Sequence, residues 1–260
     1  MLPNLLLIGA MKAGTTSLYE DLSNFDGIFM CPEKEPNDLL TDYVETEEGR
    51  ASYASKFSRG GAMKWRGEAS TSYSMMPTYK GVARRARHVL GPDIRIIYLT
   101  RDPIGRIISQ YRHLWGLGLE TRSMNSAVLG TEYISYSRYE WQLAAWRAEF
   151  ADNQILVLRF EDYVTKKEAV VQQISDFLEL PTPETSVATH RNATRDKPIV
   201  PPGGSLSSLV HSQLYYSYVK PFVPYSIRSL AKAWILPKAV QSTEQLSPST
   251  LALLEEHLRE

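Results

Sequence analysis

Residues 5–18 read Leu-Leu-Leu-Ile-Gly-Ala-Met-Lys-Ala-Gly-Thr-Thr-Ser-Leu, an order that predicts a strand, a phosphate-binding loop and a helix. The apolar run at 5–8 is typical of a buried strand. Gly9 and Gly14 let the backbone curl so that its N–H groups face an anion, and the N-terminus of the next helix adds partial positive charge. Three side chains can contact the same anion, the two hydroxyls also as helix caps: Lys12, Thr15 and Thr16.

This loop differs from the Walker loop of nucleoside triphosphatases, whose pattern is G-x-x-x-x-G-K-[ST]. Gly9 and Gly14 have the Walker spacing, but Thr15 stands where that pattern has its lysine, and the lysine lies inside the loop as Lys12. Lys-x-Gly-Thr-Thr after the first strand resembles the 5′-phosphosulfate loop of the sulfotransferases that use 3′-phosphoadenosine 5′-phosphosulfate (PAPS). Taken alone, the stretch also fits a tight turn between strand and helix with an exposed lysine.

A second candidate anion site lies within residues 94–113, where an apolar strand is followed by Arg101. Asp102 is the expected N-cap of the next helix and Pro103 its first residue. Arg101 offers a planar fork suited to a phosphate, and Ser109 adds a neutral donor. The pattern resembles the family's 3′-phosphate motif, in which a serine lies eight residues after the arginine, as here. An arginine that caps the sheet edge is the alternative.

The resemblance to the PAPS-dependent sulfotransferases covers residues 4 to about 180, and the acidic pair Glu161-Asp162 belongs to it. It implies that the first loop binds the 5′-phosphosulfate, and the ligands it implies there are Lys12, Ala13, Gly14, Thr15, Thr16 and Ser17. It implies that Arg101 and Ser109 bind the 3′-phosphate. The best counterpart of the family's late basic loop is residues 190–198, with Arg195 and Lys197 as candidate ligands.

The same resemblance implies roles in catalysis. Lys12 would stabilise the leaving phosphate, since a lysine can supply the charge without a metal. Residues 31–40 resemble the loop that carries a glutamate base in the heparan-type branch, and Glu35 is the best counterpart. Glu68 is the alternative base, although Ala69 replaces the lysine that often follows it in that branch. Glu35 and its charged neighbours also fit a plain solvated surface loop.

Strands and helices alternate along the chain. Apolar or β-rich runs predict strands at 4–9, 64–69, 94–100 and 154–160. Helical patterns lie at 15–24, 78–90, 103–115, 137–149, 165–179 and 248–259. This predicts a three-layer α/β P-loop-like fold with a central, mostly parallel sheet flanked by helices, and ligands at the carboxyl ends of the strands. Residues 1–260 are expected to form one domain, in which the Pro-, Gly- and aromatic-rich segment 181–247 is either a substrate-covering loop or a helical insertion packed on the core.

The composition of the chain bears on its partners and its cellular compartment. The 260 residues carry 29 basic and 29 acidic side chains, so no overall field favours nucleic acid or a membrane. Cys31 is the single cysteine, which excludes an internal disulfide and favours a reducing compartment. No run reaches the ~18–20 apolar residues of a membrane span. A cytoplasmic, bacterial setting is therefore expected.

These observations predict an enzyme that transfers a sulfuryl group from PAPS to a hydroxyl, or as second choice an amine, of a carbohydrate, lipid or secondary metabolite. PAPS would be the cosubstrate and 3′-phosphoadenosine 5′-phosphate (PAP) the product, with no metal required. The runner-up class is a nucleotide kinase or other P-loop phosphotransferase. A non-catalytic nucleotide-binding or scaffolding domain is the third possibility.

Overall fold

Five parallel strands form the centre of the protein in the computed structural model, which describes residues 1–61, 63–183 and 242–259. They run in the order β2-β3-β1-β4-β5, and every neighbouring pair is parallel. Their bounds are β1 (Leu5–Leu7), β2 (Ile28–Met30), β3 (Trp65–Ala69), β4 (Arg95–Thr100) and β5 (Ile155–Arg159). The predicted parallel sheet and its four strands are confirmed, and β2 is an addition that the sequence did not predict.

The two central strands are the most buried. All three side chains of β1 are inaccessible to solvent, as are Ile96 to Leu99 of β4. Continuous apolar runs of this kind are typical of parallel strands that are covered on both faces. β2 has only three residues at the sheet edge and one of them is half-buried, which explains why its sequence carries little signal.

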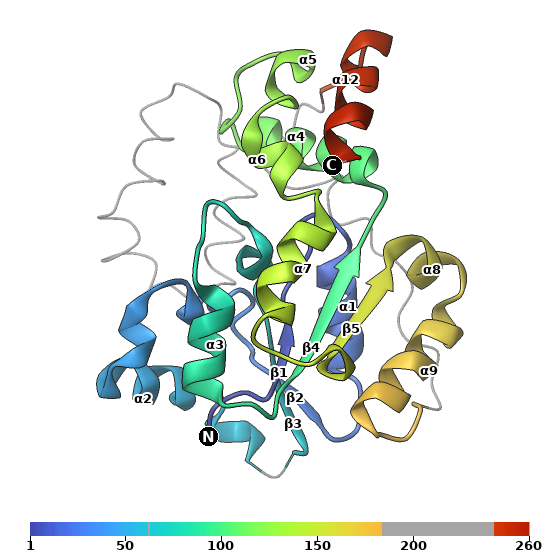
Figure 1. The fold of residues 1–260 in the computed structure, drawn as a ribbon. Coiled ribbons are helices and arrows are strands. Elements are labelled where there is room, and N and C mark those ends of the chain that lie inside the picture. Colours follow the sequence, from blue (N-terminus) through green and yellow to red (C-terminus); the bar gives the residue numbers. More distant parts are fainter. Residues whose placement is uncertain (62, 184–241, 260) are drawn as a thin grey trace, which may run out of the picture.

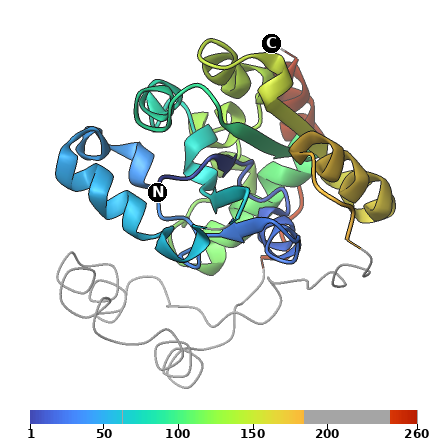
Figure 2. The ribbon, with the colours of Figure 1, turned by 90° about the horizontal axis from the view of Figure 1, so that it is seen from below.

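Helices cover both faces of this sheet, so the predicted three-layer α/β fold is confirmed. Figures 1 and 2 show α3 and α7 on one face and α1 on the other, with α9 beside β5. The helix bounds up to α6 are α1 (Thr15–Leu22), α2 (Glu47–Ser55), α3 (Val82–Leu90), α4 (Pro103–Gly116), α5 (Met124–Ala127) and α6 (Thr131–Ser135). The later ones are α7 (Tyr139–Arg147), α8 (Phe160–Thr165), α9 (Lys167–Leu178) and α12 (Pro248–Leu258).

The strands all point toward the end of the molecule where α4 begins (Figure 1). There a second apolar cluster joins α4 to α5, α6 and α12, and Ile107, Tyr111 and Leu254 are completely buried in it. Because parallel strands end at the same edge, the loops after β1, β3 and β4 open together at this end of the sheet.

A buried ion pair fixes α1, the helix that follows the first anion loop. Asp21 of α1 is only 3% exposed and accepts a hydrogen bond of 2.5 Å from the Tyr163 hydroxyl. The Lys167 ammonium lies 3.0 Å from the same carboxylate. Buried charges of this kind need such partners, and here the pair ties α1 to α8 and α9.

Part of the expected organisation falls outside the described residues. The segment 181–247 is described only at its two ends, so neither interpretation of it is tested, and Arg195 and Lys197 lie outside as well. Within the described ranges, no helix combines the length and the apolar character that a membrane crossing requires.

Candidate active site

The first anion loop lies between β1 and α1, as the sequence predicts. Gly14 is the N-cap of α1 with φ 94°, and no side chain caps the helix. The expectation that Thr15 and Thr16 cap it is therefore wrong, because both residues already lie in the first helical turn. Helix geometry leaves the first backbone N–H groups without an intrahelical acceptor. The two threonines thus bring N–H groups, and Thr16 an exposed hydroxyl, to the site where an anion would bind.

The two predicted anion motifs contact each other. Backbone bonds continue the pairing of β1 and β4 beyond the strands, with Ala10 N donating to Leu99 O at 2.7 Å. Arg101 follows directly after β4, and its Nη1 donates to the carbonyl oxygen of Lys12 at 3.2 Å. The guanidinium of one motif therefore supports the backbone of the other.

A shared aromatic ring lies beneath both motifs. The Arg101 guanidinium stands 4.9 Å from the ring centre of Phe160, the first residue of α8. The same ring approaches Gly14 so closely that a Cβ there would lie 2.7 Å from Phe160 Cδ2. Gly14 is thus required both by its left-handed φ and by this contact. Sequence reasoning missed Phe160, because its partners are distant along the chain.

The start of α4 is built as predicted. The Asp102 carboxylate accepts a hydrogen bond of 2.6 Å from Gly105 N, and Pro103 is the first helical residue. The backbone N–H of Asp102 donates to Glu161 at 2.7 Å, which places the acidic pair of the sequence motif beside this turn. Ser109 lies two turns into α4 and is partly exposed.

Glu35 reaches the first loop through Lys34. The Lys34 ammonium donates to Thr16 Oγ1 at 2.7 Å and stands 3.7 Å from Glu35 Oε1. Thr71, just beyond β3, donates to the same Oε1 at 3.2 Å. The Glu35 side chain is 37% exposed, so an acceptor can approach it. The structure thus brings together Lys12, Thr16, Arg101 and Glu35 at one edge of the sheet.

Two left-handed backbone conformations at this edge stand out. In the described chain four non-glycine residues have positive φ: Lys12, Glu35, Asn37 and Glu179. Glu179 is the C-cap of α9 and Asn37 precedes a short 3₁₀ turn, both common places for this conformation. Lys12 (φ 68°) and Glu35 (φ 59°) lack such an explanation. Strain of this kind costs about 1–3 kcal/mol per residue and clusters at functional sites.

Buried side chains fix the loop that carries Glu35. Arg85 of α3 is 6% exposed and donates to the carbonyl oxygens of Leu39 (2.7 Å) and Leu40 (3.0 Å). On the other side, the Lys56 ammonium lies 2.7 Å from Asp38 and 3.3 Å from Glu33. These contacts determine the loop conformation strongly enough to hold the strained backbone at Glu35.

Glu68, the alternative base, lies beneath this loop. It is 0% exposed, and its Oε1 accepts a hydrogen bond of 2.8 Å from the Tyr53 hydroxyl. Burial raises the pKa of Glu68 to about 7, against the lowering effects of Tyr73 and Tyr53. A carboxyl that is sealed from solvent does not meet an acceptor in this conformation, which favours Glu35 as the base.

We expect Glu68 to make the protein less stable as the pH rises. A carboxyl with a raised folded-state pKa stabilises the fold fully below its unfolded pKa near 4.5, and this contribution is lost as the pH rises through about 7. The shift corresponds to a loss on the order of 3 kcal/mol. Urea unfolding at pH 4.5 and pH 8 should show this decline in the parent and a much smaller one in Glu68→Gln. An equal decline in both proteins would contradict the assignment.

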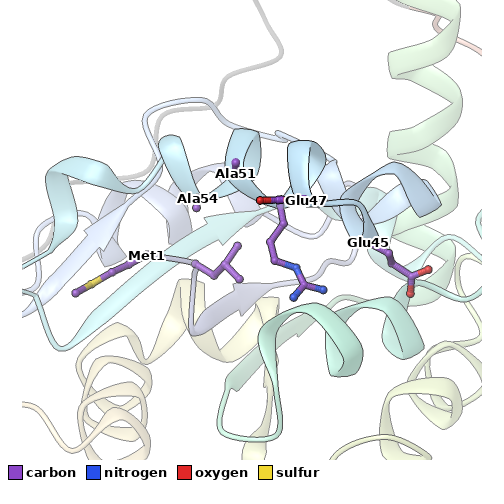
Figure 3. A pocket seen from close by; sticks show the side chains of 7 residues that line it. Met1, Glu45, Glu47, Ala51 and Ala54 are labelled. Carbon is purple, nitrogen blue, oxygen red and sulfur yellow. The ribbon is translucent and has the colours of Figure 1, made fainter.

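One surface pocket lies away from this edge. A surface pocket lined by Met1, Leu2 and the α2 region, with Arg50 among its residues, opens beside the start of β1 (Figure 3). That is the opposite end of the strands from the anion loops. Within the part of the chain that the structure describes, no three His, Cys, Asp or Glu side chains gather as metal ligands.

Comparison with known proteins finds similarity to sulfotransferases. A model of the sulfotransferase family matches residues 75–184. The crystal structure of a sulfotransferase from Alicyclobacillus acidocaldarius superposes with a TM-score of 0.64 and 26% identity, over 74% of this chain and 87% of that one. The sulfotransferase domain from the curacin biosynthetic pathway has a TM-score of 0.53 and 15% identity over 98% and 97% of the two chains, which shows a shared fold.

One curated relative is a heparan sulfate enzyme. The chain is 24% identical over 202 residues to the bifunctional heparan sulfate N-deacetylase/N-sulfotransferase 1 of Caenorhabditis elegans. The match includes 69% of this chain but only 22% of the relative, so the chain spans about a fifth of that protein's length.

The α/β fold, with the two candidate anion-binding motifs at the carboxyl ends of its strands, is one that solved sulfotransferases share. The match to the sulfotransferase family model and the likeness to solved sulfotransferases support a place for this chain among the PAPS-dependent sulfotransferases.

Proposed function

We propose that this enzyme transfers a sulfuryl group from PAPS to a hydroxyl group of a carbohydrate, lipid or secondary metabolite. Lys12 stabilises the leaving 5′-phosphate and Glu35 takes the acceptor proton. The observation that carries the proposal is the contact of 3.2 Å between Arg101 Nη1 and the carbonyl oxygen of Lys12, because it joins two separate anion-binding motifs into one site.

A donor with two phosphate-bearing ends fits these two motifs. The first loop offers the N-terminus of α1, the hydroxyls of Thr16 and Ser17 and the Lys12 ammonium to the 5′-phosphosulfate. Ala13 is completely buried and contributes through the loop backbone. Arg101 and Ser109 bind the 3′-phosphate, and a guanidinium held over an aromatic ring is already oriented for it.

Transfer breaks the bond between sulfur and the bridging oxygen and forms a bond between sulfur and the acceptor oxygen. The electron pair of the broken bond stays on the 5′-phosphate of PAP, where Lys12 meets the new charge. The acceptor proton passes to the Glu35 carboxylate. Thr71 and Lys34 contact Oε1 of Glu35, which presents Oε2 to the acceptor.

The acceptor has two candidate classes. The name of the curated relative joins N-sulfotransfer to heparan sulfate, so an amine acceptor on a glycan is the second candidate. Transfer of ³⁵S from labelled PAPS onto panels of sugars, glycolipids, phenols, polyketides and glucosamine-containing glycans distinguishes the two. If only glycans with N-unsubstituted amino sugars were labelled, the acceptor group would be an amine and the proposed hydroxyl acceptor would be wrong.

We expect Arg101→Ala to weaken PAP binding about 10- to 100-fold, because it removes a charge-assisted, pre-oriented contact to the 3′-phosphate. Isothermal titration calorimetry of the parent and the variant measures this. Arg159→Ala is the matched control, since Arg159 ends the neighbouring strand β5 but is 70% exposed and faces Glu161. Unchanged PAP affinity in Arg101→Ala would refute the assigned 3′-phosphate site.

A further inference from the structure

Lys34 occupies the junction between the donor loop and the candidate base. Its ammonium donates to Thr16 Oγ1 at 2.7 Å, and Thr16 belongs to the first turn of α1. The same ammonium lies 3.7 Å from Glu35 Oε1. One side chain therefore links the element that would hold the donor to the residue that would accept the proton.

The backbone around Lys34 explains why this link is needed. Glu35 N donates to Ala69 O at 2.9 Å, which anchors the loop to β3, and the left-handed Glu35 backbone is held from below by Arg85 and Lys56. These contacts fix the main chain of the loop but not the Glu35 carboxylate. In the part of the chain that the structure describes, Lys34 and Thr71 contact that carboxylate, and both contact Oε1.

The two partners of the Glu35 carboxylate, Thr71 and Lys34, connect it to different parts of the structure. Thr71 lies beyond β3, whereas the Lys34 contact leads to α1 and the donor loop. The Thr71 hydrogen bond by itself orients the Glu35 carboxylate only relative to the sheet. The Lys34 contact also orients the Glu35 carboxylate relative to Thr16, and thus relative to the expected position of the sulfuryl group. A misplacement of a reacting group by about 1 Å costs on the order of 10²-fold in rate.

We propose that Lys34 is a positioning residue that sets the Glu35 carboxylate against the donor loop, an inference that rests on the proposed function. The ammonium holds Oε1 of Glu35 and the hydroxyl of Thr16 together, and so couples the base to the donor site. Lys34 acts on the rate of transfer through Glu35 and contributes little to the affinity for PAP.

A double-mutant cycle tests this role with the full chain. Lys34→Met should lower kcat about 10- to 100-fold and change the Kd of PAP less than about 3-fold. In a Glu35→Gln background the same substitution should lower kcat less than about 3-fold, because its target is already gone. Lys34→Arg should restore part of the rate, since a guanidinium can reach the same two oxygens.

Control variants separate this role from a general loss of charge or structure. Lys64→Met removes a partly exposed lysine that pairs with Glu179 at 3.3 Å far from the site, and it should keep the parental kcat. A loss of kcat by Lys34→Met that is equal in both backgrounds would overturn the proposal, as would a parallel loss of PAP affinity. Failure of the parent to bind PAP would instead overturn the proposed function itself.

Discussion

Lys12→Met should lower kcat about 10²- to 10³-fold, one of the two largest effects expected at this site. The reason is that the 5′-phosphate gains charge as the bond to sulfur breaks, and a preorganised cation at that point stabilises the transition state by several kcal/mol. Binding of PAP should weaken much less, because the backbone N–H groups of the loop and the Arg101 site remain. Single-turnover rates at saturating PAPS, beside PAP affinities, measure both quantities.

The backbone conformation at residue 12 decides which substitution is informative. Lys12 has φ 68°, a conformation that any non-glycine residue adopts at a cost, so methionine keeps the cost while it removes the charge. Lys12→Arg keeps the charge and should retain more activity than Lys12→Met. A Lys12→Met enzyme with the parental rate of transfer would refute the role of the ammonium.

Glu35→Gln should lower kcat about 10²- to 10³-fold while PAP affinity stays within a few-fold of the parent. The amide has nearly the same shape but does not take up the acceptor proton, and general-base catalysis is typically worth ~10²–10⁴-fold. The measurement is the rate of sulfuryl transfer to the best acceptor found in the labelled-PAPS screen, with calorimetry for PAP.

The chain offers a matched control for this substitution in Glu68→Gln. It makes the same chemical change in the neighbouring carboxyl, which is 0% exposed and bonded to Tyr53. We expect it to change the pH dependence of stability and leave most of the activity. If Glu68→Gln lost the activity and Glu35→Gln kept it, the base would be Glu68.

Local patterns in the sequence predict much of this architecture. The apolar runs around β1 and β4, the Asp102-Pro103 helix start and the arginine after β4 carry their structure within a few residues, and each is confirmed. The arrangement of four predicted strands in a parallel sheet follows because helices alternate with them. The site residues themselves stay predictions until variants are measured.

Contacts between distant segments explain what the sequence did not predict. Phe160 and Lys34 gain their importance from partners that are 59 and 18 residues away, namely Arg101 and Thr16. β2 is too short to form a pattern. The sequence predicts the threonines after Gly14 as caps because Ser and Thr are common at that position, but Gly14, with its positive φ, is itself the N-cap.

The ring of Phe160 touches both Gly14 and Arg101, and this has a consequence for how the donor is held. In the proposed function, the loop after β1 binds the 5′ end of the nucleotide and Arg101 binds its 3′-phosphate. Because both motifs contact the same ring, we expect a shift of α8 to change the position of Gly14 and of the Arg101 guanidinium together. We therefore expect donor entry and product release to involve both motifs together, with Phe160 as the side chain that connects them.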